Sequence, residues 1–244
     1  MKVNVYFVAE EPVTLDVADH AVVVIDVLRA TSSIVEALVN GAEGIYPASS
    51  TEEAIKLASS LGREDTVLCG ESKGLMIEGF DLGNSPREFT VEQVAGKRLV
   101  MTTTNGTRTF LMTGDATRVM ACCFMNLEAV AQEVSEVEYL VVVCSGRVGL
   151  FSLEDAVCAG ALLLRVREKQ DEEIEFNDAA MAAMELANAF QVNSDFLAST
   201  AAGQRLVEIG FREDLDLCAQ IDQHTVVPEM DDRVIRVRLP EVEP

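Results

Sequence analysis

The sequence predicts an α/β protein in which a mostly parallel or mixed sheet carries helices on both faces, a three-layer α/β/α arrangement. Short apolar runs alternate with helix-like segments along residues 1–168. The apolar run at residues 21–27, interrupted only by Asp26, is typical of a strand buried on both faces. Loops rich in Gly, Ser, Thr and Asn follow several of these runs. Such alternation builds βαβ units, whose strands pair in parallel while the helices cover the sheet.

The first part of the chain sets up this alternation. Residues 2–8 alternate and are rich in Val, Tyr and Phe, which favours a first strand. A helix is expected at residues 31–40, because Gly41 ends it, and another at 51–60, because Thr-Glu-Glu opens it. The strands expected here are residues 2–8, 21–27, 44–47 and 66–69.

Residues 70–86 interrupt the pattern with four glycines and no clear period. A loop of this length inside a compact domain is usually functional. The alternation then resumes, and Ser152 with Asp155 fits a helix N-cap with an acidic third residue, a variant of the capping box. We expect strands at 98–101, 117–121 and 139–144 and helices at 107–112, 126–135 and 152–167.

The character of the sequence changes after residue 170, where an acidic stretch at 171–175 precedes a helix-like segment rich in Ala and Met at 177–190. Residues 169–244 are expected to be mainly helical, either as part of a single domain spanning 1–244 or as a second, closely packed lobe. The acidic tail from Glu241 is expected to fray. The expected helices are residues 177–190, 195–209 and 212–218, and the expected strands are residues 224–227 and 234–238.

Composition limits the kinds of partner. The formal net charge of −22 argues against a nucleic-acid backbone or an anionic membrane. No apolar run approaches the roughly 20 residues of a membrane helix, and no signal-like leader opens the sequence, so a cytoplasmic location is expected. The six cysteines form no C-x-x-C pair and are expected to be reduced core thiols.

The segment at residues 101–108, MTTTNGTR, holds four threonines, an asparagine, a glycine and an arginine. On a turn from strand to helix these groups could present hydroxyls, amides and a guanidinium to an anion. The alternative is a polar loop whose side chains only cap the next helix. Both interpretations stay open on this segment alone.

Two further strand ends carry charged groups. Asp26 and Arg29 lie three residues apart before Thr31 and Ser32, so the carboxylate could hold a metal while the guanidinium grips an anion. A simple Asp–Arg pair that braces the turn is the alternative. In residues 70–86, carboxylates among glycines suit a hard divalent cation such as Mg²⁺, and the alternative is that some of these side chains are only solvated. The charged residues of that loop are Glu71, Lys73, Glu78 and Asp81.

The common phosphatase and nucleotide-binding motifs are absent, among them G-x-x-x-x-G-K-[ST] and G-x-G-x-x-G. With only His20 and His224 in the chain, a histidine-rich metal site is excluded. Catalysis would therefore rest on carboxylates, a metal ion and cationic side chains.

Four segments together resemble the 2-phosphosulfolactate phosphatases: VIDVLRATS at 24–32, GESKGLMIEGFDLGNSP at 70–86, MTTTNGTR at 101–108 and FSLED at 151–155. Their order and spacing fit across nearly the whole chain. The resemblance implies a Mg²⁺-dependent phosphatase that converts 2-phosphosulfolactate to sulfolactate and phosphate, a step towards coenzyme M in organisms that make it. The ligand would be a small polyanion, which suits several convergent cations.

On this hypothesis Asp26, Glu71 and Asp81 hold Mg²⁺ or position the attacking water, and Arg108 assists catalysis by neutralising the substrate. Two alternatives stay open: a phosphatase of another small phosphorylated hydroxyacid, and a protein that binds such an acid without turnover. A homodimer is also left open. The groups expected to bind substrate are Arg29, Thr31, Ser32, Lys73, Asn84, Ser85, Thr103, Thr104, Asn105, Gly106, Thr107 and Ser152.

Overall fold

A computed structural model of the chain describes residues 1–9 and 17–238 and contains one large mixed sheet. The expected fraying of the tail from Glu241 lies outside the described residues. The strands are β1 (Lys2–Tyr6), β2 (Ala21–Ile25), β3 (Gly44–Pro47), β4 (Thr66–Ser72), β5 (Leu75–Met76), β6 (Arg98–Thr102), β7 (Arg118–Cys122), β8 (Tyr139–Cys144), β9 (Glu175–Phe176), β10 (Pro228–Asp231) and β11 (Val234–Val237).

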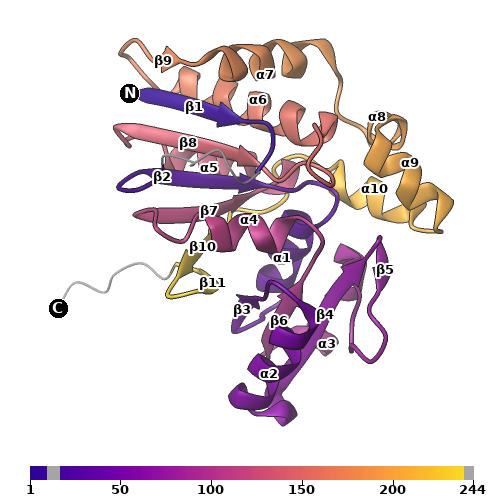
Figure 1. Cartoon of the computed structure of the whole chain (residues 1–244). Coiled ribbons are helices and arrows are strands. Elements are labelled where there is room, and N and C mark those ends of the chain that lie inside the picture. Colours follow the sequence, from indigo (N-terminus) through magenta and orange to yellow (C-terminus); the bar gives the residue numbers. More distant parts are fainter. Residues whose placement is uncertain (10–16, 239–244) are drawn as a thin grey trace.

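The helices connect these strands and cover the sheet (Figure 1). Short 3-10 turns add to them at Arg63–Asp65, Pro86–Glu88 and Phe124–Asn126. The α-helices are α1 (Ala30–Val39), α2 (Thr51–Leu61), α3 (Val91–Val94), α4 (Gly106–Met112), α5 (Leu127–Glu133), α6 (Leu153–Glu168), α7 (Asp178–Ala189), α8 (Ser194–Ser199), α9 (Ala201–Glu208) and α10 (Arg212–Cys218).

Two sets of parallel strands make up the sheet. The larger set has the order β7-β2-β8-β1-β9, and the smaller set has the order β4-β6-β3. The antiparallel hairpin of β10 and β11 lies between them and pairs with β7 on one side and with β3 on the other. Figure 1 shows the two sets inclined to one another, with the arrowheads of β2 and β4 both directed towards the side on which α9 and β5 lie.

The core follows the alternation of β2. Val23 and Ile25 point into one apolar cluster, which α5, α6 and α7 cover. Val22 and Val24 point into a second cluster on the opposite face, which contains Ile34 of α1. Because successive side chains of a strand point to opposite faces, a strand that is apolar throughout requires helices on both sides. The expected α/β fold with helices on both faces is confirmed.

Some local expectations were wrong. The loop expected at 70–86 begins with a short antiparallel hairpin, since β4 continues to Ser72 and pairs with β5. The strand expected at 224–227 is instead β10, which begins at Pro228. The region after residue 169 contains α7 to α10, yet β9, β10 and β11 join it to the same sheet. Sequence patterns mark these short strands poorly because pairing with distant strands decides them.

Two expectations from composition can be compared with the structure. All six cysteines are buried and form no disulfide, as expected for core thiols. Among residues 1–9 and 17–238, no helix has the length and apolar character needed to cross a bilayer.

Candidate active site

A cavity of about 330 Å³ lies where the carboxyl ends of β2, β4, β6 and β8 meet α9 of the C-terminal region. Strand ends are where ligands bind in sheets of this class, so the cavity has the expected position. Its walls combine buried carboxylates, amides, hydroxyls and basic side chains. The lining residues are Asp26, Leu28, Arg29, Glu71, Lys73, Gly74, Asn84, Thr103, Thr104, Asn105, Gly146, Arg147, Val148, Ser152, Glu154, Asp155, Ala202, Arg205 and Leu206.

The structure brings together a good part of the residues expected from the sequence. Those that line the cavity are Asp26, Arg29, Glu71, Lys73, Asn84, Thr103, Thr104, Asn105 and Ser152. Those that stand behind its wall or elsewhere are Thr31, Ser32, Asp81, Ser85, Gly106, Thr107 and Arg108.

Asp26 follows β2 and is held in a tight turn at the start of α1. Its Oδ1 accepts the N–H of Ala30 at 3.1 Å, and its backbone carbonyl accepts both the N–H and the hydroxyl of Thr31. Burial is the main reason that the pKa of the Asp26 carboxyl is raised to about 7, and the hydrogen bond from the Ala30 N–H partly offsets this rise. The nearby charges of Glu71 and Glu154 contribute to this rise. Thr31 therefore braces the turn rather than facing the cavity.

Gly106 lies directly against Asp26. A Cβ atom at this position would come within 2.7 Å of Asp26 Oδ2 and 2.4 Å of the Ala30 Cβ. Only glycine fits a backbone approach this close. Gly106 thus lets the start of α4 rest on the turn that carries Asp26, behind the cavity wall.

Glu154 and Asp155 come from the first turn of α6 and are each 2% exposed. Asp155 accepts the N–H of Val27 at 2.9 Å and that of Gly146 at 3.3 Å. Burial raises the pKa of the Asp155 carboxyl well above its usual value, and the charges of Glu154 and Asp26 add to the rise. Both Asp155 oxygens are thus occupied by the loops that carry the other site residues.

Ser152 does not cap α6 with its side chain, so the expected capping box was wrong. Its hydroxyl instead donates to Glu154 Oε1 at 2.6 Å. The second oxygen of Glu154, Oε2, is buried and accepts no hydrogen bond from the described residues. A buried carboxylate oxygen without a donor is costly unless a ligand or cation supplies the missing contact.

Glu71 joins the β4–β5 hairpin to the threonine loop at 102–107. Its Oε1 accepts the N–H of Thr104 at 2.7 Å, and its Oε2 accepts the N–H of Gly74 at 2.7 Å. In the same loop, Thr103 and Thr107 each accept the other's backbone N–H at 3.0 Å through their hydroxyls. Several N–H donors that could have faced an anion are therefore used inside the protein.

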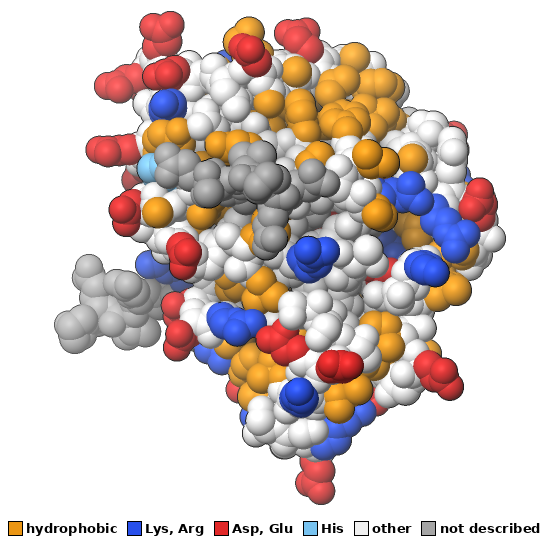
Figure 2. All heavy atoms as spheres, in the orientation of Figure 1, with side chains coloured by type: hydrophobic (Ala, Val, Ile, Leu, Met, Phe, Trp, Pro, Cys, Tyr) orange, Lys and Arg blue, Asp and Glu red, His pale blue; other side chains and the backbone are white. Residues whose placement is uncertain are grey.

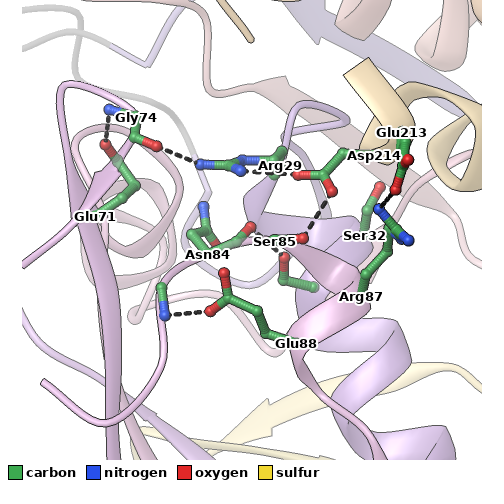
Figure 3. Close-up of polar contacts among 12 residues, drawn as sticks. Arg29, Ser32, Glu71, Gly74, Asn84, Ser85, Arg87, Glu88, Glu213 and Asp214 are labelled. Atoms are coloured by element: carbon green, nitrogen blue, oxygen red, sulfur yellow. Dashed lines mark hydrogen bonds and ion pairs between the residues drawn. The ribbon is translucent and has the colours of Figure 1, made fainter. Parts of the chain in front are cut away.

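Arg29 forms a buried network rather than a free anion clamp (Figure 3). Its Nη1 donates to Asp214 Oδ2 at 2.8 Å, and its Nη2 donates to the Gly74 carbonyl at 2.7 Å. Its guanidinium also lies over the Phe211 ring, 4.5 Å from the centroid. The hydroxyl of Ser85 donates to the other Asp214 oxygen at 2.6 Å. Arg29 and Ser85 thus belong to a network that joins α1, the β4–β5 turn and α10, and their expected anion-binding roles stay predictions.

Two other residues with expected polar roles also hydrogen-bond within the framework. Ser32 donates its hydroxyl to the Val27 carbonyl at 2.9 Å. Asn84 is held through its backbone, because its carbonyl accepts the Ser33 hydroxyl at 2.9 Å. The Asn84 Oδ1 is buried and has no hydrogen-bond donor among the described residues, although its residue lines the cavity. Asn84 therefore keeps an unused acceptor beside the site.

Asp81 and Arg108 lie apart from the cavity. The Asp81 carboxylate accepts from Arg63 Nη2 at 2.9 Å and from the Leu68 N–H at 2.8 Å. Partial burial raises the pKa of Asp81, but these two donors outweigh it and hold that pKa below its usual value. Arg108 is exposed on α4 and does not line the cavity. Neither residue is placed where the sequence hypothesis needed it.

Several lining residues escaped sequence reasoning. Glu154 follows Ser152 in a segment that fits helix capping, so its pattern did not separate a ligand from a cap. Arg147 belongs to the loop after β8, and the rule of strand ends did point to it as a basic residue in such a loop, although it was not included among the expected site residues. Ala202, Arg205 and Leu206 lie on one face of α9, and only the packing of α9 against the strand ends brings them to the cavity.

The carboxylates do not form a ready-made cage for a metal ion. Within the described part of the chain, no three His, Cys, Asp or Glu side chains are arranged to hold one by themselves. Mg²⁺ usually takes one or two carboxylates and completes its shell with water and ligand phosphate. Asp26 Oδ2 and the unpaired Glu154 Oε2 fit such a sparse donor set.

The sequence is similar to a known family over almost its full length. A family described as 2-phosphosulpholactate phosphatase matches residues 6–233. Three similar proteins are each named "Probable 2-phosphosulfolactate phosphatase". The one from Synechococcus is 42% identical, covering 91% of this chain and 94% of the relative. The one from Caldanaerobacter subterraneus is 39% identical (91% and 92%), and the one from Clostridium acetobutylicum is 36% identical (94% and 97%).

Proposed function

The chain belongs to the 2-phosphosulpholactate phosphatase family, and we propose that it hydrolyses 2-phosphosulfolactate to sulfolactate and phosphate in the cavity described above. Water attacks phosphorus, the bond between phosphorus and the C2 oxygen breaks, and that oxygen gains a proton. The observation that carries the site assignment is the group of buried carboxylates at the cavity floor, among which Glu154 Oε2 lacks any donor.

Charge balance supports a divalent cation in this reaction. Asp26, Glu71, Glu154 and Asp155 bring negative charge to a cavity that must accept a polyanion. Arg29 offsets little of it, because Asp214 already pairs with its guanidinium. An added cation would remove the repulsion between these carboxylates and the phosphate.

We assign Mg²⁺ to Asp26 and Glu154, whose free oxygens are Oδ2 and Oε2. When bound, the ion would offset the charge on the phosphate oxygens and favour ionisation of water. Asp155 orients the loops of Val27 and Gly146, and Glu71 fixes the loop of Thr104. Asp81, which the sequence hypothesis included, is left out because Arg63 engages it outside the cavity.

The direct experiment measures phosphate release from racemic 2-phosphosulfolactate, with Mg²⁺ and after chelation by EDTA. We expect release with Mg²⁺ and its loss after chelation. Absence of release from folded protein under both conditions would refute the proposed activity and favour a binding protein without turnover. A panel of other phosphorylated hydroxyacids tests the remaining alternative. The homodimer and the link to coenzyme M stay predictions.

A further inference from the structure

The basic residues of the cavity divide by depth. The carboxylates at the floor of the cavity are almost fully buried, since Asp26 is 7% and Glu154 2% exposed. Lys73 is exposed at the turn of the β4–β5 hairpin, Arg147 is half-buried after β8, and the side chain of Arg205 on α9 is 40% exposed. These three cations therefore form the rim of the cavity, above the carboxylates.

The cationic side chains of the rim form few ion pairs with carboxylates of the protein. Within residues 1–9 and 17–238, neither Lys73 nor Arg147 forms an ion pair. Among the residues that the structure describes, Arg205 forms an ion pair only with Glu208, one turn along the same helix, at 3.4 Å and exposed to solvent. Exposed pairs of this type contribute little to stability. An anionic ligand can displace Glu208 at small cost.

Packing fixes α9 close to the hairpin. A Cβ atom on Gly74 would lie 2.7 Å from the Ile209 Cδ1, so the turn that carries Lys73 touches the end of α9. Arg205 is one helical turn before Ile209 and therefore lies on the same side of the helix. Figure 2 shows basic side chains grouped on the side of the molecule where Figure 1 places α9 and β5.

The face of α9 also supplies an apolar surface. Ala202 and Leu206 line the cavity beside Arg205. A guanidinium next to a small apolar patch suits an oxyanion carried on a methylene group, because the patch contacts the carbon while the guanidinium binds the oxygens. The sulfonomethyl arm of 2-phosphosulfolactate has this chemistry.

We propose that Arg205 of α9, assisted by Arg147, binds the sulfonate of the substrate and so determines specificity for a sulfonated hydroxyacid. The proposal rests on the proposed function, whose phosphoryl chemistry it places at the floor, while the sulfonate is held at the rim. The helical region after residue 170 then has a recognition role. Its helix α9 forms the side of the cavity that binds the part of the substrate farthest from the reacting phosphorus.

The test compares 2-phosphosulfolactate with 2-phospholactate, which has a methyl group in place of the sulfonomethyl arm. The readout is the ratio of the two kcat/KM values. R205M is expected to lower this ratio by roughly 10–100-fold, as for the loss of charge-assisted hydrogen bonds. R147M is expected to lower it in the same direction, and R205K is expected to retain part of the preference. Arg212→Met is the matched control, because the Arg212 side chain on α10 is 41% exposed, close to the value for Arg205, and does not line the cavity.

Equal losses on both substrates, or an unchanged ratio in R205M, would overturn the assignment. A second measurement does not depend on turnover. Sulfolactate is expected to raise the Tm of the wild-type protein more than lactate does, and R205M is expected to lose that difference. If the wild-type protein releases no phosphate but shows this difference, the proposed function fails while the sulfonate site stands. If sulfolactate and lactate act alike on the wild-type protein, the sulfonate site fails.

Discussion

Arg29 Nη1 lies 2.8 Å from Asp214 Oδ2, although 185 residues separate the two in the sequence. Their side chains are 3% and 2% exposed, so the pair is shielded from water. The same guanidinium holds the Gly74 carbonyl, and the same carboxylate holds Ser85. One ion pair thus connects α10 to the turn after β2 and to the β4–β5 hairpin.

Loss of Asp214 is expected to be strongly destabilising. Asp214→Ala leaves the Arg29 charge buried without a partner, which typically costs about 3–5 kcal/mol of the free energy of unfolding. Urea denaturation measures the change. Asp216→Ala is the control on the same helix, since its pair with Arg212 is exposed and contributes little. Similar losses in the two variants would contradict the buried role of Asp214.

Gly106→Ala is expected to damage both stability and activity. The new methyl group would meet Ala30 Cβ and Asp26 Oδ2, and overpacking of this kind costs roughly 1–3 kcal/mol. The displaced Asp26 carboxylate should also lower phosphate release. Gly114→Ala is the matched control, because its Cβ would meet only the Leu111 carbonyl at 3.5 Å. If Gly106→Ala has wild-type stability and wild-type phosphate release, the prediction is wrong and the turn that carries Asp26 can move to accommodate the methyl group.

The pH dependence of stability follows from Asp26. Its pKa is about 7 in the folded protein against a usual 3.8, so between these values the folded state keeps a proton that the unfolded state releases. Asp26 thus contributes stability at low pH that is lost as pH rises through about 7. In Mg²⁺-free urea denaturation, the fall in free energy of unfolding between pH 5 and 8 should be smaller in D26N than in wild type, by on the order of 1–3 kcal/mol. Equal pH slopes would contradict the raised pKa.

Magnesium should stabilise the protein through the same carboxylate. We expect Mg²⁺ to raise Tm more at pH 8 than at pH 6, since a carboxyl must lose its proton to bind the ion. At a concentration 100-fold above Kd, the gain is about 2.7 kcal/mol. E154Q should weaken this response, while D81N should keep it, because Asp81 faces Arg63 outside the cavity. A response lost in D81N and kept in E154Q would reverse the assignment.

Sequence reasoning predicted those residues of the candidate site whose position follows from local pattern. Asp26 and Glu71 lie at the ends of apolar strands, and the strands of a parallel sheet bring such ends together. The alternation of β and α segments was also sufficient for the layers of the fold. The number of short strands was not, because β5 and β9 have two residues each and depend on their partners.

Other parts of the site depend on contacts between segments far apart in the chain. Arg29 looked like an anion clamp because its partner, Asp214, belongs to a helix whose position the sequence does not indicate. Asp81 looked like a metal ligand because the sequence does not show that Arg63, 18 residues earlier, donates a hydrogen bond to its carboxylate. Arg205 carried no signal at all, because a single arginine on a short helix is common on protein surfaces.

The position of the β10–β11 hairpin has a consequence for synthesis of the protein. The hairpin fills the centre of the sheet, between β3 and β7, yet it is made from residues near the end of the chain. During translation the facing edges of the two parallel strand sets stay open until residue 237 has left the ribosome, and open strand edges are prone to aggregate. Nascent chains that stop before residue 228 should therefore need chaperone protection, whereas chains that contain β10 and β11 fill the gap between β3 and β7.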